Sequence, residues 1–299
     1  MTEIFNGKKT ASRFLAKLQP DLDDLNSVYK ISVRLGIIRI GKNPSSALYV
    51  KKKLKIFKSL GLEAHEYWFD ETISYQDLCS KIDDLNHDVA VHGIIIQLPL
   101  PSHFNVQEIC NQITPLKDVD GLTLHNQGLL LQNNLSGLIP CTPLGCTFIL
   151  KSLFNDLSGK RTLVLGRSLL VGKPAALLLL HENATVTIAH SQTENLPELI
   201  GSTDILISAI GQPHCIKGSW IKKGAVVLDV GITKSMSSNS PLFLGDVDFE
   251  EACKNTSFIT PVPGGIGPMT VACLVYNTYK AAKRILTGTP ALYDLSILS

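Results

Sequence analysis

Residues 162–180, TLVLGRSLLVGKPAALLLL, join an apolar run to a helical pattern through a turn that contains Gly166 and Gly172. A buried strand that passes through a glycine turn into a helix places free backbone N–H groups and the positive end of the helix dipole where a pyrophosphate can bind. The spacing differs from the Gly-x-Gly-x-x-Gly of standard dinucleotide-binding turns. Taken alone, the stretch is equally consistent with nucleotide binding and with a plain strand-to-helix turn.

More apolar runs follow this stretch, each about 20 residues after the last, and most are separated by a helical segment. The predicted strands cover residues 162–165, 185–189, 205–209 and 225–229. Parallel strands linked by crossover helices have this pattern. The fold class is therefore predicted as α/β, with a Rossmann-like, doubly wound sheet in this part of the chain.

The N-terminal part shows the same alternation of apolar runs and helical segments. Predicted helices cover residues 11–18, 47–60 and 75–86, and predicted strands cover residues 31–40, 64–69 and 93–97. The last of these strands runs into Leu98-Pro99-Leu100-Pro101, and proline cannot extend a strand ladder. The chain is expected to turn away from the sheet there.

Two further helices are predicted. Thr142 is a suitable N-cap residue and Pro143 suits the first helical position, so a helix is expected to start there and to end by Gly159. The other helix, residues 269–286, has no strand after it, and we expect it to pack back on the first domain. The serine-rich segment 235–240 is expected to be at most a loop.

These elements predict two domains. The first comprises residues 1–121 and is completed by the C-terminal helix and tail, residues 270–299. The second comprises residues 122–269 and contains the predicted doubly wound sheet.

Composition narrows the class of protein. The 299 residues are 44% apolar and 18% charged, which excludes disordered and collagen-like chains, and apolar runs such as Ala175 to Leu180 are far shorter than the roughly 20 residues of a membrane span. The N-terminus lacks a signal or transit pattern, so a cytoplasmic location without membrane attachment is expected. The seven cysteines have no metal-ligand spacing and are expected to be reduced thiols, with no metal. A net charge of +2 argues against nucleic acid as a partner and favours a small ligand.

The end of the second predicted strand of the C-terminal series bears on the choice of nucleotide. An NAD-type fold has an acidic residue there for the ribose hydroxyls, but Val186 to Thr193 contains none and includes Ser191. Arg167 follows Gly166, so a guanidinium and a hydroxyl can together bind a ribose 2′-phosphate, which favours NADP. The alternative is that Arg167 is a surface ion-pair partner and Ser191 a loop hydroxyl. Glycine turns at residues 209–211 and 229–232 fall on the same ligand-binding edge.

Tyr49 and Lys53 are four residues apart in a predicted helix, so an aromatic ring and an amine lie on one face. The plainer interpretation is a solvated basic face with Tyr49 as half-buried packing, because four other lysines lie in the same helix. The Tyr-x-x-x-Lys spacing also resembles that of short-chain dehydrogenases. In those proteins, however, the pair follows the glycine-rich turn, whereas here it precedes that turn by more than 100 residues.

Three other segments carry polar or glycine-rich chemistry. Gln97 closes an apolar strand, and it can bind a ligand or satisfy strand-end backbone groups. The segment Lys117-Asp118-Val119-Asp120-Gly121 contains carboxylates that can accept hydrogen bonds from an amidine-like ring edge or cap the next turn. Residues 261–270, PVPGGIGPMT, form a loop that can close on a flat ligand or serve as an interdomain hinge.

Together these segments resemble the bifunctional methylenetetrahydrofolate dehydrogenase/cyclohydrolase family, known in bacteria as FolD. The matching motifs occur in family order between about residues 40 and 275. They are Ser46-x-x-Tyr49-Val50-x-x-Lys53, Gln97-Leu98-Pro99-Leu100-Pro101, Lys117-Asp118-Val119-Asp120-Gly121, Gly166-Arg167-Ser168-x-x-Val171-Gly172-x-Pro174 and Pro261-Val262-Pro263-Gly264-Gly265-x-Gly267-Pro268-Met269-Thr270. One departure is mild: Pro44-Ser45-Ser46 stands where the family usually has Pro-Ala-Ser.

The resemblance implies an enzyme that oxidises 5,10-methylenetetrahydrofolate with NADP and hydrolyses the 5,10-methenyl product to 10-formyltetrahydrofolate. It implies that Tyr49 stacks on the aminobenzoate ring, that Lys53 is the base and acid, and that Gln97 positions Lys53. It further implies a folate site completed by Ile96, Leu98, Asp120, Pro263, Gly264, Gly265 and Gly267. The implied NADP site comprises Gly166, Arg167, Ser168, Ser191 and Ile232, and relatives are commonly homodimers. The alternative from the residues alone is a two-domain NAD(P) dehydrogenase of another small substrate.

Overall fold

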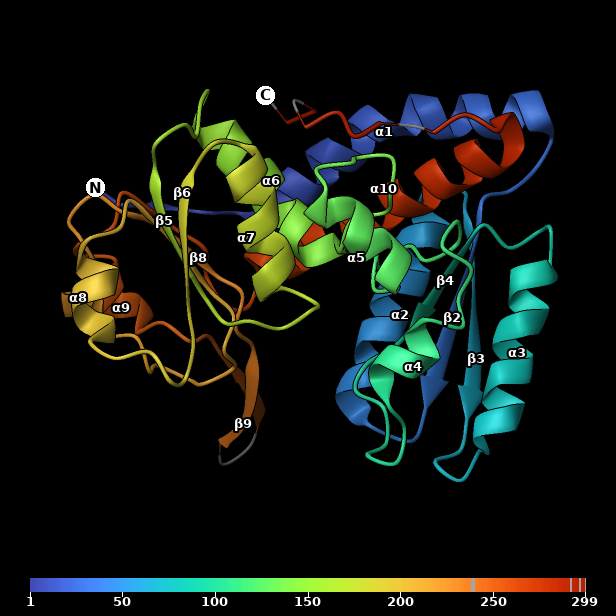
Figure 1. The fold of residues 1–299 in the computed structure, drawn as a ribbon, viewed down its shortest axis with the longest axis horizontal. Helices are drawn as coiled ribbons and strands as arrows, with labels where there is room; N and C mark the ends of the chain where they lie inside the picture. Colours follow the sequence, from blue (N-terminus) through green and yellow to red (C-terminus); the bar gives the residue numbers. More distant parts are fainter. Residues whose placement is uncertain (238–239, 291, 296, 299) are drawn as a thin grey trace. The chain divides into compact units, whose positions relative to one another are not determined.

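A computed structural model describes residues 1–237, 240–290, 292–295 and 297–298, and the chain divides into two compact units (Figure 1). The six-stranded unit comprises residues 1–14, 142–272 and 294–299. The three-stranded unit comprises residues 15–141 and 273–293. Among the described residues, none of the helices is both long enough and apolar enough to cross a bilayer.

The six-stranded unit is built on a parallel sheet in the order β1-β11-β8-β7-β5-β6. From β5 the chain moves outward to β6 and then returns to β7 on the other side of β5, so the winding reverses between β5 and β7. This arrangement confirms the doubly wound α/β sheet. The strands are β1 (Glu3–Ile4), β5 (Arg161–Leu165), β6 (Thr185–Ala189), β7 (Ile205–Ser208), β8 (Val226–Asp229) and β11 (Phe258–Ile259).

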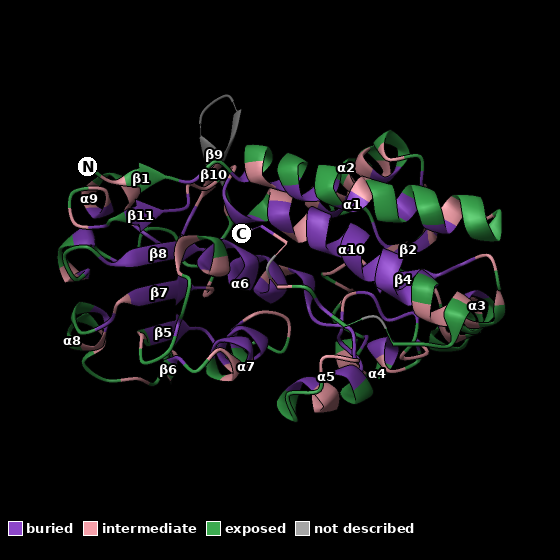
Figure 2. Ribbon diagram, turned by 90° about the horizontal axis from the view of Figure 1, so that it is seen from above, coloured by how far each residue is buried: buried purple, intermediate pink, exposed green. Residues whose placement is uncertain are grey.

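The central strands of this sheet are buried on both faces, as parallel strands between helical layers should be (Figure 2). Leu163, Leu206 and Val227 form the centre of the core cluster and are essentially inaccessible to solvent. The helices of the unit are α6 (Cys141–Leu153), α7 (Gly172–His181), α8 (Leu196–Gly201), the 3-10 turn η1 (Gly218–Trp220) and α9 (Phe249–Ala252).

Two details of this unit correct the sequence-based expectations. Helix α6 begins at Cys141, and the Thr142 hydroxyl lies 3.0 Å from that of Thr270, so Thr142 is inside the helix and is not its N-cap. The loop prediction for residues 235–240 was wrong at both ends, because residues 235–237 and 240 lie in an antiparallel ribbon of β9 (Thr233–Ser237) and β10 (Ser240–Leu244). Residues 238–239, within that predicted loop, lie outside the described residues.

The three-stranded unit has a parallel sheet in the order β3-β2-β4, with the apolar strand β2 in the middle. Its strands are β2 (Arg34–Ile40), β3 (Glu63–Phe69) and β4 (Gly93–Ile96). Its helices are α2 (Pro44–Ser59), α3 (Tyr75–His87), α4 (Val106–Cys110) and α5 (Leu124–Leu131). Helix α2 starts where the sequence provides a cap: Asn43 Oδ1 accepts hydrogen bonds from the backbone N–H groups of Ser45 and Ser46, and Pro44 occupies the first position.

Two long helices run through both units, α1 (Gly7–Tyr29) and α10 (Ile266–Thr287). The prediction for α1, residues 11–18, was too short, because the polar stretch around Pro20 hid the spacing of Leu18, Leu22 and Leu25, all of which are buried. Residues 273–287 of α10 belong to the three-stranded unit, which confirms the expected return of the C-terminal helix. They are buried along most of their length (Figure 2).

The division of the chain differs from the expected one at residues 122–141, which include α5 and group with the three-stranded unit, and at the N-terminus. Residues 1–14 group with the six-stranded unit and not with the rest of residues 1–121, because β1 adds to the edge of the parallel sheet. Phe5 also packs against Phe258, with ring centroids 5.6 Å apart. A two-residue strand has too little pattern to be read from the sequence.

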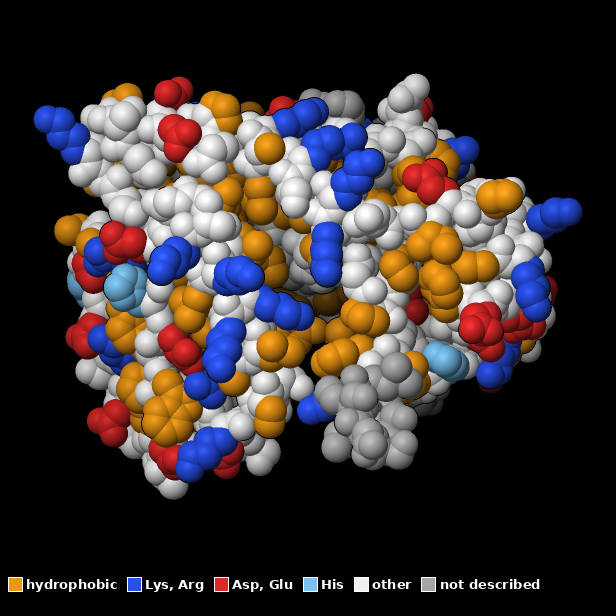
Figure 3. All heavy atoms as spheres, turned by 180° about the vertical axis from the view of Figure 1, so that it is seen from behind, with side chains coloured by type: hydrophobic (Ala, Val, Ile, Leu, Met, Phe, Trp, Pro, Cys, Tyr) orange, Lys and Arg blue, Asp and Glu red, His pale blue; other side chains and the backbone are white. Residues whose placement is uncertain are grey.

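Acidic and basic side chains are both present on the face shown in Figure 3, and the whole chain carries nearly equal numbers of them, 28 Lys and Arg against 26 Asp and Glu. The seven cysteines are all free thiols.

Candidate active site

Lys53 and Gln97 are brought together by two neighbouring elements of the three-stranded unit. Lys53 projects from α2, and Gln97 follows β4, where its backbone N–H still donates to the carbonyl of Ile38 in β2. The Lys53 ammonium donates to Gln97 Oε1 at 3.0 Å. Gln97 Nε2 donates to the carbonyl of Leu98 at 2.8 Å, which fixes the amide so that its oxygen faces the lysine.

The environment of Lys53 favours a neutral amine more than water does. Burial lowers the pKa of Lys53 below its ordinary value of 10.5, while the Asp120 carboxylate and Cys141 act in the opposite direction. Burial is the larger influence. The arrangement therefore provides an amine that loses its proton more readily than a surface lysine does, while the nearby Asp120 carboxylate limits the fall of its pKa.

Tyr49 lies one turn before Lys53 on the same helix and is half-buried. Burial raises the pKa of its hydroxyl, so the ring stays a neutral aromatic surface at physiological pH. The Lys52 ammonium lies 5.5 Å from the ring centroid. Tyr49 thus offers a face on which a flat ligand can stack.

Two residues of the segment from Lys117 to Gly121 are held in structural hydrogen bonds. The Lys117 ammonium is only 7% exposed and donates to three carbonyls at the end of α3, those of Leu85, Asn86 and Asp88. Asp118 is 1% exposed and accepts from the backbone N–H groups of Leu122 and Thr123 and from the Asn126 amide. These two residues hold the fold.

Asp120 is the remaining carboxylate of that segment. It is half-buried, and it influences both Lys53 and Cys141 electrostatically. Among the two acids of this segment, Asp120 is therefore the one available to a ligand beside Lys53.

Replacing Lys117 with methionine tests its structural assignment. The variant keeps the volume of the side chain but leaves three carbonyls at the end of α3 without their donor, and we expect a loss of about 2–4 kcal/mol in the free energy of unfolding. Urea denaturation measures this loss. The Lys55→Met variant, at an exposed position of α2, should unfold like the wild type. Equal stability of the two variants would contradict the assignment.

The chain turns at Leu98-Pro99-Leu100-Pro101 as the sequence predicted, with a cis peptide bond before Pro99. The Ser46 hydroxyl donates to the carbonyl of Leu98 at 3.4 Å, which ties this turn to α2. An open hollow of about 570 Å³ adjoins the turn. Among the described residues, its lining comprises Ile40, Asn43, Glu71, Thr72, Pro99, Leu100, Pro101, Ser102 and His103, and does not include Tyr49 or Lys53.

The glycine turn after β5 has the features of a phosphate-binding turn. Gly166 has a φ of +125°, and a Cβ atom at this position would lie 2.5 Å from the carbonyl oxygen of Ala209, so only glycine fits. A Cβ at Gly172 would collide with the Gly166 carbonyl. The Ser168 hydroxyl accepts from the N–H groups of Val171 and Gly172 at the start of α7. The two glycines thus allow close backbone packing where β5 passes into α7, the place at which a doubly wound sheet presents a helix N-terminus to a nucleotide phosphate.

Arg167 and Ser191 occupy matching places on neighbouring strand ends. Leu165 in β5 pairs with Ala189 in β6, and the Gly166 N–H donates to the Ala189 carbonyl. Arg167 lies two residues after Leu165 and Ser191 two residues after Ala189, so both follow the same paired positions. Both side chains are exposed. Ile232, which follows β8 on the same edge, is 45% exposed.

The loop of residues 261–265 belongs to the six-stranded unit and closes on itself. The Gly265 N–H donates to the Pro261 carbonyl at 2.8 Å, and the Gly7 N–H donates to the Gly264 carbonyl at 3.0 Å. Gly267 lies in the first turn of α10. These hydrogen bonds fix the backbone of the loop, and its glycines leave that backbone without side chains over it.

Comparison with known proteins decides the family. A family model described as the catalytic domain of tetrahydrofolate dehydrogenase/cyclohydrolase matches residues 5–120, and one described as its NAD(P)-binding domain matches residues 140–286. The Bifunctional protein FolD of Wolbachia pipientis from Culex pipiens is 44% identical over 94% of this chain and 96% of its own length. This chain belongs to the tetrahydrofolate dehydrogenase/cyclohydrolase family.

Solved structures of the family agree with that assignment. The methylenetetrahydrofolate dehydrogenase/cyclohydrolase of Campylobacter jejuni is 40% identical, with a TM-score of 0.90 over 95% of this chain and 99% of its own. The Trypanosoma brucei enzyme, solved with NADP cofactor and an inhibitor, is 34% identical, with a TM-score of 0.92 over 95% of this chain and 98% of its own.

Sequence reasoning missed Cys141 as a neighbour of the family's lysine motif. Its thiol is buried, donates to the Val119 carbonyl at 3.3 Å, and has a pKa raised by burial and by Asp120. The only sequence signal was its place two residues before Pro143, which pointed to a helix start and not to the lysine.

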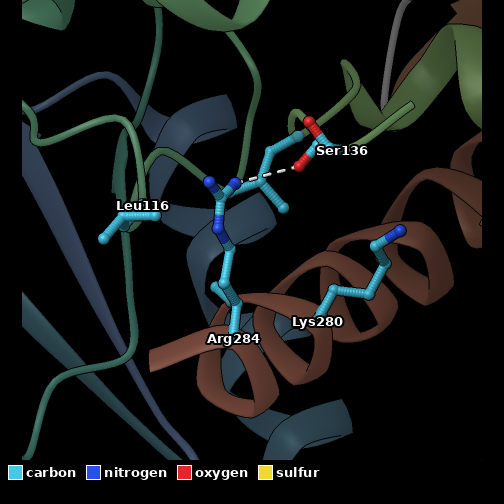
Figure 4. A pocket seen from close by; sticks show the side chains of 6 residues that line it. Leu116, Ser136, Lys280 and Arg284 are labelled. Carbon is cyan, nitrogen blue, oxygen red and sulfur yellow. Dashed lines mark hydrogen bonds between the residues drawn. The ribbon is translucent and has the colours of Figure 1, made fainter. Parts of the chain in front are cut away.

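A second lysine of this unit, Lys280 in α10, lines a cavity of about 10 Å³ with Arg284, Ser136 and Leu116 (Figure 4). Arg284 donates to the Ser136 carbonyl at 3.0 Å. The Lys280 nitrogen lies 3.2 Å from the centroid of the Tyr293 ring, and burial lowers the pKa of Lys280 to about 6. The cavity holds at most one water molecule, so it cannot be a folate or nucleotide site.

Proposed function

We propose that this protein oxidises 5,10-methylenetetrahydrofolate with NADP and then hydrolyses the 5,10-methenyl product to 10-formyltetrahydrofolate. The observation that carries the proposal is the hydrogen bond from the ammonium of the half-buried Lys53 to the fixed Gln97 amide. Family membership and the glycine turn after β5 support the dehydrogenase half. The names of the FolD relatives support both activities.

In the proposed hydrolysis, the neutral Lys53 amine takes a proton from the water that attacks the methenyl carbon. It then returns that proton to the ring nitrogen, whose bond to the former methenyl carbon breaks as the five-membered ring opens, while the hydroxyl proton of the adduct passes to solvent and the formyl C=O forms. Gln97 holds the amine in place through Oε1, and Asp120 keeps the pKa of Lys53 from falling further. Tyr49 stacks on the aminobenzoate ring, and Asp120 accepts hydrogen bonds from the pterin edge. Ile96, Leu98, Pro263, Gly264, Gly265 and Gly267 are proposed as further folate contacts.

NADP supplies the hydride acceptor when it is bound. We assign its phosphates to the turn formed by Gly166, Arg167 and Ser168, and its 2′-phosphate to Arg167 and Ser191. Ile232 contributes an apolar contact from the end of β8. In domain terms, residues 1–121 with 270–299 are proposed to bind folate and residues 122–269 to bind NADP, with residues 1–14 contributing structurally to the NADP-binding unit and residues 122–141 to the folate-binding unit.

Absorbance of the methenyl intermediate tests the function directly. With 5,10-methylenetetrahydrofolate and NADP, the wild type should form reduced NADP and a transient methenyl signal, and added methenyltetrahydrofolate should decay without NADP. Formation of no reduced NADP from this substrate would favour a dehydrogenase of another small molecule. Formation of reduced NADP without faster decay of methenyltetrahydrofolate would contradict the proposed hydrolase activity.

We also propose a homodimer in the cytoplasm. Strand β6 lies at the edge of its sheet, with Thr185, Thr187 and Ile188 exposed along it, and such an edge can pair with a second copy. The free thiols fit a reducing compartment. Light scattering tests the assembly: a mass twice that of the 32.6 kDa chain supports it, and the mass of a single chain contradicts it.

A further inference from the structure

Two buried carboxylates in the six-stranded unit have no role in the function proposed above. Asp229 ends β8 and is 4% exposed, and Asp246 follows β10 and is fully buried. Burying a carboxylate is costly unless it accepts several hydrogen bonds. The donors that hydrogen-bond to Asp229 and Asp246 therefore indicate the role of the two carboxylates.

Asp246 holds the turn that follows β7. Its Oδ2 accepts from the Ser208 hydroxyl at 2.8 Å and from the Ile210 N–H at 2.9 Å, and its Oδ1 accepts from the Gln212 N–H at 2.8 Å. Both carboxylate oxygens are thus committed to residues 208–212. Those residues have no strand partner for these N–H groups beyond the end of β7.

Asp229 holds the turn that follows β8 and the segment that carries Asp246. Its Oδ1 accepts from the N–H groups of Gly231 and Asp246, both at 3.1 Å, and its Oδ2 accepts from the Val247 N–H at 2.9 Å. The two acids are therefore linked in series: Asp229 fixes the backbone of Asp246, and Asp246 fixes the turn after β7.

Two glycines admit the carboxylates reciprocally. A Cβ atom at Gly231, two residues after Asp229, would collide with the Asp246 carboxylate. A Cβ atom at Gly245, just before Asp246, would collide with the Asp229 carboxylate. Gly231 thus leaves room for the Asp246 carboxylate next to Asp229, and Gly245 leaves room for the Asp229 carboxylate next to Asp246.

This linkage reaches the glycine turn after β5. Strands β5, β7 and β8 are neighbours in the sheet, and a Cβ at Gly166 would touch the Ala209 carbonyl, which precedes the Ile210 N–H held by Asp246. The position of Gly166 therefore depends on where Asp246 holds residues 209–210. The reversal of the winding between β5 and β7 is where such sheets bind their ligand.

We propose that Asp246 and Asp229 are positioning residues for the nucleotide, which fix the turns after β7 and β8 against the Gly166 turn so that the phosphate-binding backbone is preformed. The inference rests on the proposed binding of NADP. A preformed turn binds without an ordering cost, so loosening it weakens nucleotide binding before it alters the chemical step. The three-stranded unit, with Lys53, carries none of these hydrogen bonds.

Asp246→Asn tests the proposal. The asparagine keeps the shape but turns an N–H₂ group toward donors, and we expect the dissociation constant for NADP, measured by calorimetry, and the Michaelis constant for NADP to rise at least about tenfold. At saturating NADP, kcat should return to within about twofold of the wild type, and methenyl hydrolysis and the folate Michaelis constant should not change. Asp248→Asn is the matched control, because Asp248 lies two residues away and only caps α9. It should bind NADP like the wild type.

Two results would overturn the proposal. One is NADP binding by Asp246→Asn equal to that by Asp248→Asn, and the other is a loss of kcat with an unchanged dissociation constant. If Asp246→Asn does not fold, Ser208→Ala removes a single donor to Asp246, and it should raise the dissociation constant about two- to threefold; an unchanged constant contradicts the proposal. Failure of the wild type to bind NADP would instead remove the proposed function.

Discussion

Lys53→Met is expected to lower the rate of methenyltetrahydrofolate hydrolysis by about 10²- to 10⁴-fold, the contribution typical of a positioned acid–base group. Methionine keeps most of the buried volume but cannot take or return a proton. Because the substitution lies in the three-stranded unit, the dissociation constant for NADP should stay within about twofold of the wild type. Decay of the methenyl absorbance and calorimetric titration with NADP measure the two effects.

Lys52→Met provides the control for this variant. Lys52 precedes Lys53 in α2 but is exposed, and its ammonium lies against the Tyr49 ring. It should hydrolyse the methenyl compound at a rate close to that of the wild type. Hydrolysis by Lys53→Met at the rate of Lys52→Met would remove Lys53 from the mechanism.

Arg167→Ala is expected to raise the Michaelis constant for NADP by about 10- to 100-fold and to change that for NAD by less than about threefold. The reason is that a guanidinium bound to a phosphate contributes charge-assisted hydrogen bonds, and NAD has no 2′-phosphate to receive them. Initial rates of methylenetetrahydrofolate oxidation with each cofactor measure the ratio.

Arg161→Ala is the matched control, because Arg161 is an exposed arginine at the opposite end of the same strand, β5. It should leave both Michaelis constants unchanged. Parallel increases for NADP and NAD in Arg167→Ala would show that Arg167 does not distinguish the two cofactors.

The doubly wound sheet could be predicted because its strands are short, apolar and regularly spaced. Strands β6 and β7 begin at the predicted residues, and β5 and β8 differ from the prediction by one residue at their start. The ends of α1 could not be predicted in the same way. Pro20 and the acids after it resemble a helix end, and only burial of Leu22 and Leu25 explains why the helix continues.

The candidate site was partly readable because helical spacing is a local property. The spacing of four positions from Tyr49 to Lys53 placed both on one face of α2, but nothing local indicated that Gln97 would meet Lys53. That contact depends on the parallel pairing of β2 with β4, which brings together residues 44 positions apart.

Among the acids, residue type was no guide to role. Asp118 and Asp120 are both followed within a few residues by a turn. Asp118 nevertheless accepts three hydrogen bonds, two from backbone N–H groups and one from the Asn126 amide, whereas Asp120 acts on the pKa of Lys53. Asp246 was overlooked for a similar reason, because its partners lie 34 to 38 residues earlier in the chain.

The acid–base role of Lys53 requires that its amine lose a proton more easily than an ordinary lysine. Burial lowers the pKa of Lys53, so the neutral fraction grows as pH rises through a value below 10.5, and hydrolysis should rise with it. The most direct measurement is a heteronuclear NMR titration of the lysine side chains, with the Lys53 signal assigned by its absence in Lys53→Met. The account predicts a midpoint clearly below 10.5, whereas a midpoint at or above 10.5 would contradict it.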